Sequence, residues 1–305
     1  MKQPRIAVLL AAYNGKEWLH EQLVSIWNQV EVSVHVFISV DQSNDGTEFL
    51  VDDFASKDAR ITVLPHGQKF GGAVSNFFRL IDDVSFDGFD YVSFSDQDDI
   101  WSPDKLSRAN CKMLEMGADG YSSNVTAFWP SGRQMLIKKS QPQREWDFLF
   151  EAGGPGCTYV MTVKLAQIIQ QYIHKHQTAL KDVWLHDWFC YSFSRAKGFK
   201  WFIDDYSSLM YRQHLYNQVG VNSGWKALLY RVRQIVGGQG IKQSILIARL
   251  MKLDSNPFVK KWMTGERLGL IWLAFKARSC RRRLRDQILF VFSCLIMAVM
   301  GPYQI

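Results

Sequence analysis

The sequence predicts an α/β protein with a mixed, mostly parallel sheet flanked by helices, followed by a basic helical C-terminal region. Over residues 1–115, short apolar runs rich in β-strand formers alternate with stretches of helical spacing, which is typical of β-α-β units. The composition then changes, because residues 226–285 contain 15 Lys and Arg against two acids. We therefore expect two domains, one at residues 1–224 and a basic helical one at residues 225–305.

The predicted strands are short apolar runs that each end in turn-forming polar residues. They cover residues 6–12, 34–40, 61–64 and 91–95. The first run follows two basic residues, as a secretory signal would. However, it has only seven apolar residues and leads directly into a Tyr-Asn-Gly turn, so we interpret it as a buried strand.

Helical spacing separates these runs. Apolar side chains recur at steps of three and four over residues 18–27, and Asn14 and Glu17 are placed like a capping box at the start of this helix. Three further helices are expected after turn signals at residues 45–47, at residues 71–72, and at Ser102 and Pro103 as N-cap and first helical position.

An acidic cluster directly follows the fourth predicted strand. In an open α/β sheet, ligands bind outside the carboxyl ends of the strands, where Asp96, Asp98 and Asp99 are expected to lie. Carboxylates this close repel one another unless a cation offsets their charge, and oxygen ligands suit Mn²⁺ or Mg²⁺. A solvated turn that caps the next helix is the alternative. The polar turns after the other three strands favour the metal site.

Six motifs in chain order resemble one enzyme family. They are AAYNG at 11–15, DQSNDGT at 41–47, FGGAVSNF at 70–77, SDQDDIWSPDKL at 95–106, HDW at 186–188 and YRQH at 211–214. Together they resemble the inverting nucleotide-sugar glycosyltransferases of family 2, which have the GT-A fold. The combination is most similar to the bacterial rhamnosyltransferases of O-antigen and capsule assembly, and it spans residues 1–220.

The resemblance implies a role for each matching position. Asp187 would be the general base, and Asp96, Asp98 and His214 would lie at a Mn²⁺ or Mg²⁺ ion. The residues implied at the donor nucleotide are Ala12, Tyr13, Asn14, Asp41, Ser43, Gly71, Asn76, Asp96 and Gln97. Those that could contact the acceptor or the transferred sugar are Gly156, Trp184, His186 and Trp188. Packing without a catalytic role is the alternative for the two histidines and the tryptophans, and Cys157 is expected to be structural.

The implied reaction transfers a sugar from a nucleoside diphosphate to a growing cell-surface polysaccharide, expected to be carried on a polyprenyl diphosphate. The first choice of donor is dTDP-L-rhamnose. UDP-linked galactose, glucose or N-acetylglucosamine are alternatives, as is a non-catalytic module that binds glycans or nucleotide sugars. The presence of Asp98 and Asp187 favours an enzyme. No Gly-x-Gly-x-x-Gly follows the first strand, which argues against a nicotinamide-dependent enzyme.

The C-terminal region predicts helices at residues 225–236 and 241–253, then apolar and basic runs. The apolar run at residues 288–301 has 14 residues, fewer than the roughly 20 that cross a bilayer as a helix. Basic amphipathic helices beside such runs favour in-plane attachment to an anionic membrane, here the cytoplasmic face of the inner membrane. An ordinary helical or oligomerising domain is an alternative. A nucleic-acid-binding tail is disfavoured, because no binding motif accompanies the charge.

Overall fold

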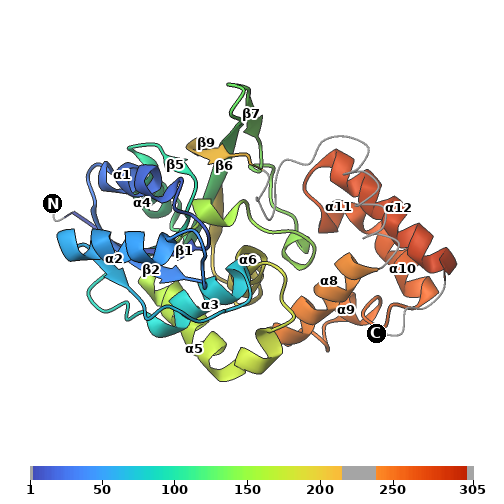
Figure 1. Ribbon diagram of the computed structural model, residues 1–305. Helices are drawn as coiled ribbons and strands as arrows, with labels where there is room; N and C mark the ends of the chain where they lie inside the picture. The colour runs from blue at the N-terminus through green and yellow to red at the C-terminus, as the bar shows by residue number, and fades with distance from the viewer. Residues whose placement is uncertain (1–2, 215–237, 301–305) are drawn as a thin grey trace.

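A computed structural model describes residues 3–214 and 238–300 (Figure 1). Its sheet has nine strands, eight of them in the order β3-β2-β1-β4-β8-β6-β9-β5, with β7 paired to β6. Four parallel strands form one half and confirm the predicted ones: β1 (Arg5–Ala12), β2 (Ser33–Val40), β3 (Ile61–Val63) and β4 (Tyr91–Asp96).

The other half of the sheet is mixed and was not predicted strand by strand. Its strands are β5 (Ile100–Trp101), β6 (Gly120–Phe128), β7 (Gln134–Ile137), β8 (Val160–Thr162) and β9 (Trp201–Arg212). Strand β8 runs antiparallel to both β4 and β6, and β9 runs parallel to β6 with two shifts of register. Strand β5 pairs antiparallel with the end of β9, which carries the second half of the chain back to the acidic turn after β4.

Helices cover both faces of the sheet. Those of the first part are α1 (Leu19–Trp27), α2 (Thr47–Lys57), α3 (Ala73–Asp83), α4 (Lys105–Met116), α5 (Val163–Leu180) and α6 (His186–Ala196), with the short 3₁₀ turns η1 (Asp147–Leu149) and η2 (Gly156–Thr158). Alternate side chains of β1 enter opposite cores: Leu9 packs on the side of α3, α5 and α6, and Leu10 on the side of α1 and α4.

Two predicted helix starts were wrong. Helix α1 begins after Trp18 without a side-chain cap, because Asn14 belongs to the preceding loop, where its Oδ1 accepts the N–H of Asn44. Helix α4 begins at Lys105, after Asp104, instead of at Pro103. The N–H of Ser102 donates to the carbonyl of Ser208 on β9, so the chain is still pairing with that strand where a helix was expected to start.

The C-terminal helices pack against the sheet domain. They are α8 (Gln239–Leu250), α9 (Pro257–Lys260), α10 (Arg267–Phe275), α11 (Ala277–Cys280) and α12 (Leu284–Met300). Figure 1 shows them in orange and red beside α6, on the side away from α1 and α2. One continuous apolar core joins α8, α10 and α12 to α3, α5 and α6. The predicted helix at residues 225–236 and the domain boundary at 224 lie outside the described residues.

A buried arginine reinforces this contact. The side chain of Arg282, only 1% exposed, lies 3.6 Å from a carboxylate oxygen of Asp147 and 3.4 Å from one of Glu151. Its guanidinium also donates to the carbonyl of Ala152 at 2.5 Å. Since a charge removed from water must be paired, these contacts fix the C-terminal region against η1.

Candidate active site

A cleft of about 1510 Å³ opens at the carboxyl ends of β1, β2 and β4. Its walls come from the loops after these strands, the start of α3, the turn η2 and the start of α6. The link between α11 and α12 also contributes to it. The sheet order explains the meeting of these segments, because β1 lies between β2 and β4 and their loops therefore face one rim.

The acidic cluster lies at the centre of this cleft. Asp96 ends β4 opposite Ala11 of β1, and burial, then the charges of Asp98 and Asp187, raise its pKa to about 7. Asp99 is 1% exposed, and neither of its carboxylate oxygens has a hydrogen-bond partner among the described residues. Burial also raises the pKa of Asp99 well above its ordinary value. Negative charge is therefore in excess here.

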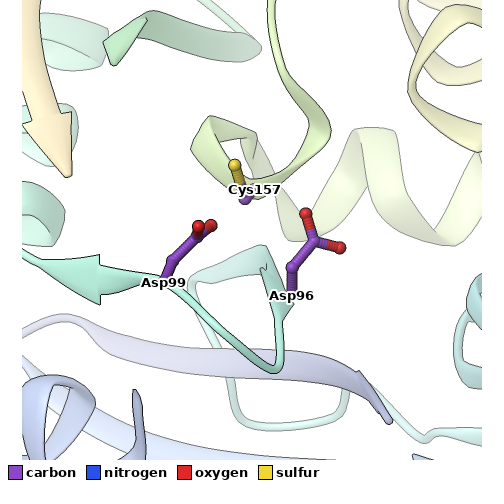
Figure 2. A group of neighbouring side chains, drawn as sticks. All are labelled: Asp96, Asp99 and Cys157. Carbon is purple, nitrogen blue, oxygen red and sulfur yellow. The ribbon is translucent and has the colours of Figure 1, made fainter. Parts of the chain in front are cut away.

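Figure 2 shows Asp96 and Asp99 extending toward the thiol of Cys157 on η2. One ligand atom from each of the three lies within 4.8 Å of the others. Burial raises the pKa of Cys157 well above its ordinary value, which agrees with a structural thiol. The unpartnered carboxylate oxygens and the raised pKa of Asp96 fit a divalent cation, because a cation would remove the repulsion between these groups.

A buried lysine beside the cluster was not indicated by the sequence pattern. Lys105, the first residue of α4, is fully buried, and burial lowers its pKa to about 7. Its ammonium lies 3.5 Å from the ring centroid of Trp101 and 3.3 Å from the hydroxyl of Ser93. Asp99 favours the charged form of this lysine, so Lys105 offsets part of the negative charge from beneath the cleft.

His214 lies against the carboxylate of Asp98. Its Nε2 lies 2.6 Å from Oδ2 of Asp98, and its ring stacks on Trp18 with centroids 4.1 Å apart. Nearby, Nε of Arg212 donates to the carbonyl of Asp98 at 2.9 Å. The motif at residues 211–214, far away in sequence, therefore lies against the acidic turn, as the resemblance implies.

Gln97 joins the loops after β1 and β4. Its Oε1 accepts the N–H of Tyr13 at 2.7 Å, and its Nε2 donates to the carbonyl of Tyr13 at 2.8 Å. Gly15 lies against this amide, and a Cβ there would overlap the Gln97 side chain. The ring of Tyr13 is 55% exposed and lines the cleft, where it is available to a ligand.

Further polar residues brace the loops after β1 and β2. The N–H of Asn14 donates to the hydroxyl of Ser43 at 3.0 Å. Asn76, on α3, is buried and donates to the carbonyls of Ala12 at 3.3 Å and Ser39 at 3.0 Å. These contacts hold the two strand ends together. All but Ser43 and Ser39 also line the cleft.

Asp41 anchors the loop that precedes α3. Its carboxylate accepts the N–H groups of Gln42, Phe70, Gly71 and Gly72 at distances between 2.7 and 3.2 Å. Both glycines have positive φ, at 98° and 114°, a conformation that other residues rarely adopt. The structure therefore gives Asp41 and Gly71 a role in shaping the loop. The contact of Asp41 with the donor nucleotide stays a prediction.

Asp187 lies in the first turn of α6 and faces the same cleft. Burial raises its pKa to about 6, although the N–H of Trp188 donates to its Oδ1 at 2.6 Å. Gly156 lies directly opposite. A Cβ on this glycine would stand 3.1 Å from Cβ of Asp187 and 2.8 Å from Nε2 of His186. A carboxylate with a pKa close to neutrality in a cleft is suited to accept a proton.

His186 forms part of the wall. Its ring stacks on Phe77 with centroids 3.8 Å apart and meets Phe94 edge-on. Burial lowers its pKa to about 3, so the imidazole is neutral. Its position supports the packing alternative, although the side chain also lines the cleft beside Asp187.

The two predicted tryptophans divide between two cavities. Trp188 is buried, donates from Nε1 to the carbonyl of Phe148 at 2.8 Å, and lines both the cleft and an adjacent cavity of about 540 Å³. Trp184 is 42% exposed and lines the smaller cavity. The structure therefore does not bring Trp184 together with the carboxylates.

A basic group on the other side of the cleft was not predicted as part of the site. It consists of Lys139, Arg281, Arg283 and Arg285. The arginines lie in a run that we assigned from the sequence to the membrane surface. The high density of arginines in this run could have indicated an anion-binding site. However, nothing in their spacing indicates that the run folds back to the cleft.

Comparison with known proteins identifies the family. Residues 7–156 match the model of the family described as glycosyl transferase family 2. The chain is also 40% identical over 291 residues to the dTDP-rhamnosyl transferase RfbG of Shigella flexneri. This alignment covers 95% of this chain and 100% of that protein. The chain belongs to glycosyltransferase family 2. The predicted family and enzyme class are thereby confirmed.

Solved structures confirm the GT-A fold of this family 2 enzyme. TarS 1-349 of S. aureus in complex with UDP-GlcNAc superposes with a TM-score of 0.53 at 13% identity, covering 99% of this chain and 93% of that chain. The mannosyltransferase PcManGT of Pyrobaculum calidifontis, in complex with GDP-Man and Mn²⁺, has a TM-score of 0.51 at 14% identity. This superposition covers 98% of this chain and 87% of the mannosyltransferase chain. At these identities the likeness concerns the fold.

Proposed function

We propose that this family 2 glycosyltransferase moves L-rhamnose from dTDP-rhamnose to a growing cell-surface polysaccharide, with inversion at the anomeric carbon. The observation that carries the choice of donor is the 40% identity with a dTDP-rhamnosyl transferase over nearly the whole of both chains. A UDP-linked hexose is the second candidate, because the TarS structure of the same fold holds UDP-GlcNAc.

In this proposal Asp187 acts as the general base. A sugar hydroxyl has a pKa far above neutrality, so its attack on the anomeric carbon requires a carboxylate that takes the proton as the bond forms. A pKa of about 6 leaves Asp187 ionised at neutral pH while keeping it more basic than an ordinary carboxylate. One displacement by the activated hydroxyl inverts the configuration of the transferred sugar.

Asp96 and Asp98 would hold a divalent cation, Mn²⁺ or Mg²⁺, with His214 beside Asp98. When bound, such an ion supplies positive charge that neutralises the departing nucleoside diphosphate. Tyr13 and Asn14 border the space for the nucleotide, and Gln97 fixes the loop that carries Tyr13. Asp99 and Lys105 are buried beside Asp96 and Asp98, and their charges add to or offset the negative charge of these two carboxylates.

The donor and the base can be tested in one assay. Nucleotide release from dTDP-rhamnose and from UDP-hexoses is measured with Mn²⁺ or Mg²⁺ and a saccharide acceptor, and we expect turnover with dTDP-rhamnose that stops in chelator. Asp187→Asn should lower kcat by roughly 100- to 10,000-fold. The exposed Asp182→Asn, five residues away, serves as the matched control. A faster reaction with a UDP-hexose would overturn the donor, and near-normal turnover of Asp187→Asn would overturn the base.

We further propose that the enzyme attaches to the cytoplasmic face of the membrane through α10 and α12. No helix within residues 3–214 and 238–300 combines the length and apolarity of a membrane span. However, these two helices carry the exposed apolar side chains Leu268, Ile271, Phe275, Leu284, Ile288, Leu289, Phe292, Leu295, Ile296, Val299 and Met300. The exposed cations Lys276, Arg278 and Arg285 lie on the same segment.

Flotation with vesicles tests this attachment. We expect the protein to float with vesicles that contain phosphatidylglycerol and to dissociate partly as salt rises, because salt screens the basic side chains. Phe292→Glu should abolish flotation, whereas Phe49→Glu, at an exposed phenylalanine on α2, should not. Absence of binding at low salt would overturn the proposal.

A further inference from the structure

The smaller cavity adjoins the active-site cleft and shares four lining residues with it. Phe150, Trp188, Arg281 and Asp286 line both spaces. With about 540 Å³, the smaller cavity falls within the range of roughly 300–1,000 Å³ that is usual for ligand pockets. A ligand could therefore occupy both at once, with one part beside Asp187 and another in the smaller cavity.

Apolar side chains dominate the wall of the smaller cavity. Leu289, Phe290, Cys294 and Met297 come from α12, and Ile241 comes from α8. Leu289 is also 42% exposed, on the helix whose outer surface is apolar. The cavity therefore borders the surface through which we propose that the protein meets the membrane. Its chemistry suits a hydrocarbon chain.

The cleft carries opposite charges on its two sides. The loops after β1, β2 and β4 contribute mostly acids, with Lys16 among them, whereas Lys139, Arg281, Arg283 and Arg285 line another part of the cleft. Of these four cations, Arg281 also lines the apolar cavity. Two acids face this basic group, but each already has a partner. Asp286 lies 3.4 Å from Nε of Arg285, and Glu151 lies 3.4 Å from a guanidinium nitrogen of Arg282 and 3.9 Å from one of Arg281.

Two of the cations form no short contact with an acid. Among the described residues, the side chains of Arg283 and Lys139 make no hydrogen bond and no ion pair within 4.0 Å. Burial lowers the pKa of Lys139, whereas the charge of Glu151 raises it. A donor diphosphate has its expected position among the carboxylates, where a cation would hold it. A second anionic group is therefore expected near Arg283.

We propose that the apolar cavity and the basic group form the binding site for a lipid-linked diphosphate acceptor. The cavity holds the proximal part of the prenyl chain, Arg281, Arg283 and Lys139 bind the diphosphate, and the sugar to be extended lies toward Asp187. This inference rests on the proposed function, for which it specifies the acceptor. It also explains why the C-terminal helices pack beside the cleft, because they supply both the cavity and the arginines.

Gly240 offers a way to close the cavity without disturbing the fold. It lies in the first turn of α8 and lines the cavity, and a Cβ added there meets no described atom within 4 Å. Gly240→Phe should therefore fill the cavity, and Gly240→Ala is its matched control. Arg283→Gln removes the free guanidinium, and Arg278→Gln, at an exposed position outside both cavities, is the second control.

The test measures binding of farnesyl diphosphate to the full-length protein by calorimetry. We expect Kd to rise at least tenfold in Gly240→Phe and in Arg283→Gln, and to stay within twofold in the two controls. Inorganic diphosphate should bind more weakly than farnesyl diphosphate in the wild type, and Gly240→Phe should not change its affinity. Binding of dTDP in the presence of Mn²⁺ serves as the measure of an intact fold and of the donor site.

Two results would overturn the inference. One is unchanged binding of farnesyl diphosphate in Gly240→Phe and Arg283→Gln. The other is equal displacement of farnesyl diphosphate by lysophosphatidylglycerol, which would assign the cavity to a membrane lipid. Because the binding assay requires no sugar transfer, it tests the acceptor site independently of the proposed function. Loss of dTDP-rhamnose turnover with retained farnesyl diphosphate binding would refute only the donor.

Discussion

Replacing Asp96 with Asn should stabilise the metal-free protein at alkaline pH while destroying its activity. The folded carboxyl has a pKa of about 7, against an ordinary value of 3.8, because burial and the neighbouring carboxylates Asp98 and Asp187 disfavour its ionised form. Below pH 4 the group is protonated in both the folded and the unfolded chain, so its contribution to stability is fully present. As pH rises through 7, this contribution is lost, because the unfolded chain releases the proton more readily.

The size of the effect follows from the two pKa values. A difference of about three units corresponds to at most about 4 kcal/mol of unfolding free energy above pH 7. Asp96→Asn removes this penalty, so in chelator the variant should be more stable than the wild type at pH 8 and equal to it near pH 4. Mn²⁺ at 100 times its Kd should stabilise the wild type by roughly 2.7 kcal/mol and the variant by much less.

Urea unfolding followed by tryptophan fluorescence at pH 4, 6 and 8 measures these differences. Asp53→Asn, at an exposed carboxylate paired with Lys57 at 2.7 Å, is the control and should shift stability by less than about 0.5 kcal/mol. The reasoning is refuted if Asp96→Asn is less stable than the wild type at pH 8 in chelator. A difference between the two proteins that does not change with pH would refute it equally.

Three further predictions concern the base and its surroundings. In the wild type, kcat should fall about tenfold per pH unit below the pKa of Asp187, about 6, and a flat profile between pH 5 and 8 would exclude this carboxylate as the base. Gly156→Ala should lower kcat on the order of 100-fold, because its methyl group would crowd Asp187 and His186; steady-state kinetics with unchanged kcat would contradict this. Arg282→Ala should lower the unfolding free energy, measured in urea, by about 3–5 kcal/mol, because it leaves Asp147 and Glu151 buried without their partner. Arg278→Ala is the control and should lower it by less than about 1 kcal/mol. A loss as small as this in Arg282→Ala would argue that Arg282 does not stabilise the contact.

The first half of the fold could be predicted because its signals are local. Each parallel strand is an apolar run closed by a turn, so β1 to β4 are found within two residues of their expected bounds. Helices α2 and α3 follow the turn signals that were expected to precede them. The antiparallel half depends on pairing between distant segments. Nothing in the sequence near Ile100 shows that it pairs with Met210, and this pairing delays the start of α4.

The candidate site shows the same division. Asp96, Asp98 and Asp187 could be proposed from short motifs, because their residue types and their neighbours are distinctive. Lys105 and Arg283 could not, because their importance comes from what surrounds them. Lys105 is notable only because α4 buries it near Asp99. Arg283 is notable because the chain returns to the cleft more than 60 residues after His214.

The shared core between the sheet domain and the C-terminal helices limits how the chain can be shortened. A truncation before α8 would uncover Trp188 and Phe189 and would strand Asp147 and Glu151 in an apolar setting without Arg282. The segment that we propose for membrane attachment thus also contributes to the wall of the active-site cleft. Point substitutions on the outer surface of α12, with the helix itself retained, would therefore remove its exposed apolar side chains without opening the cleft.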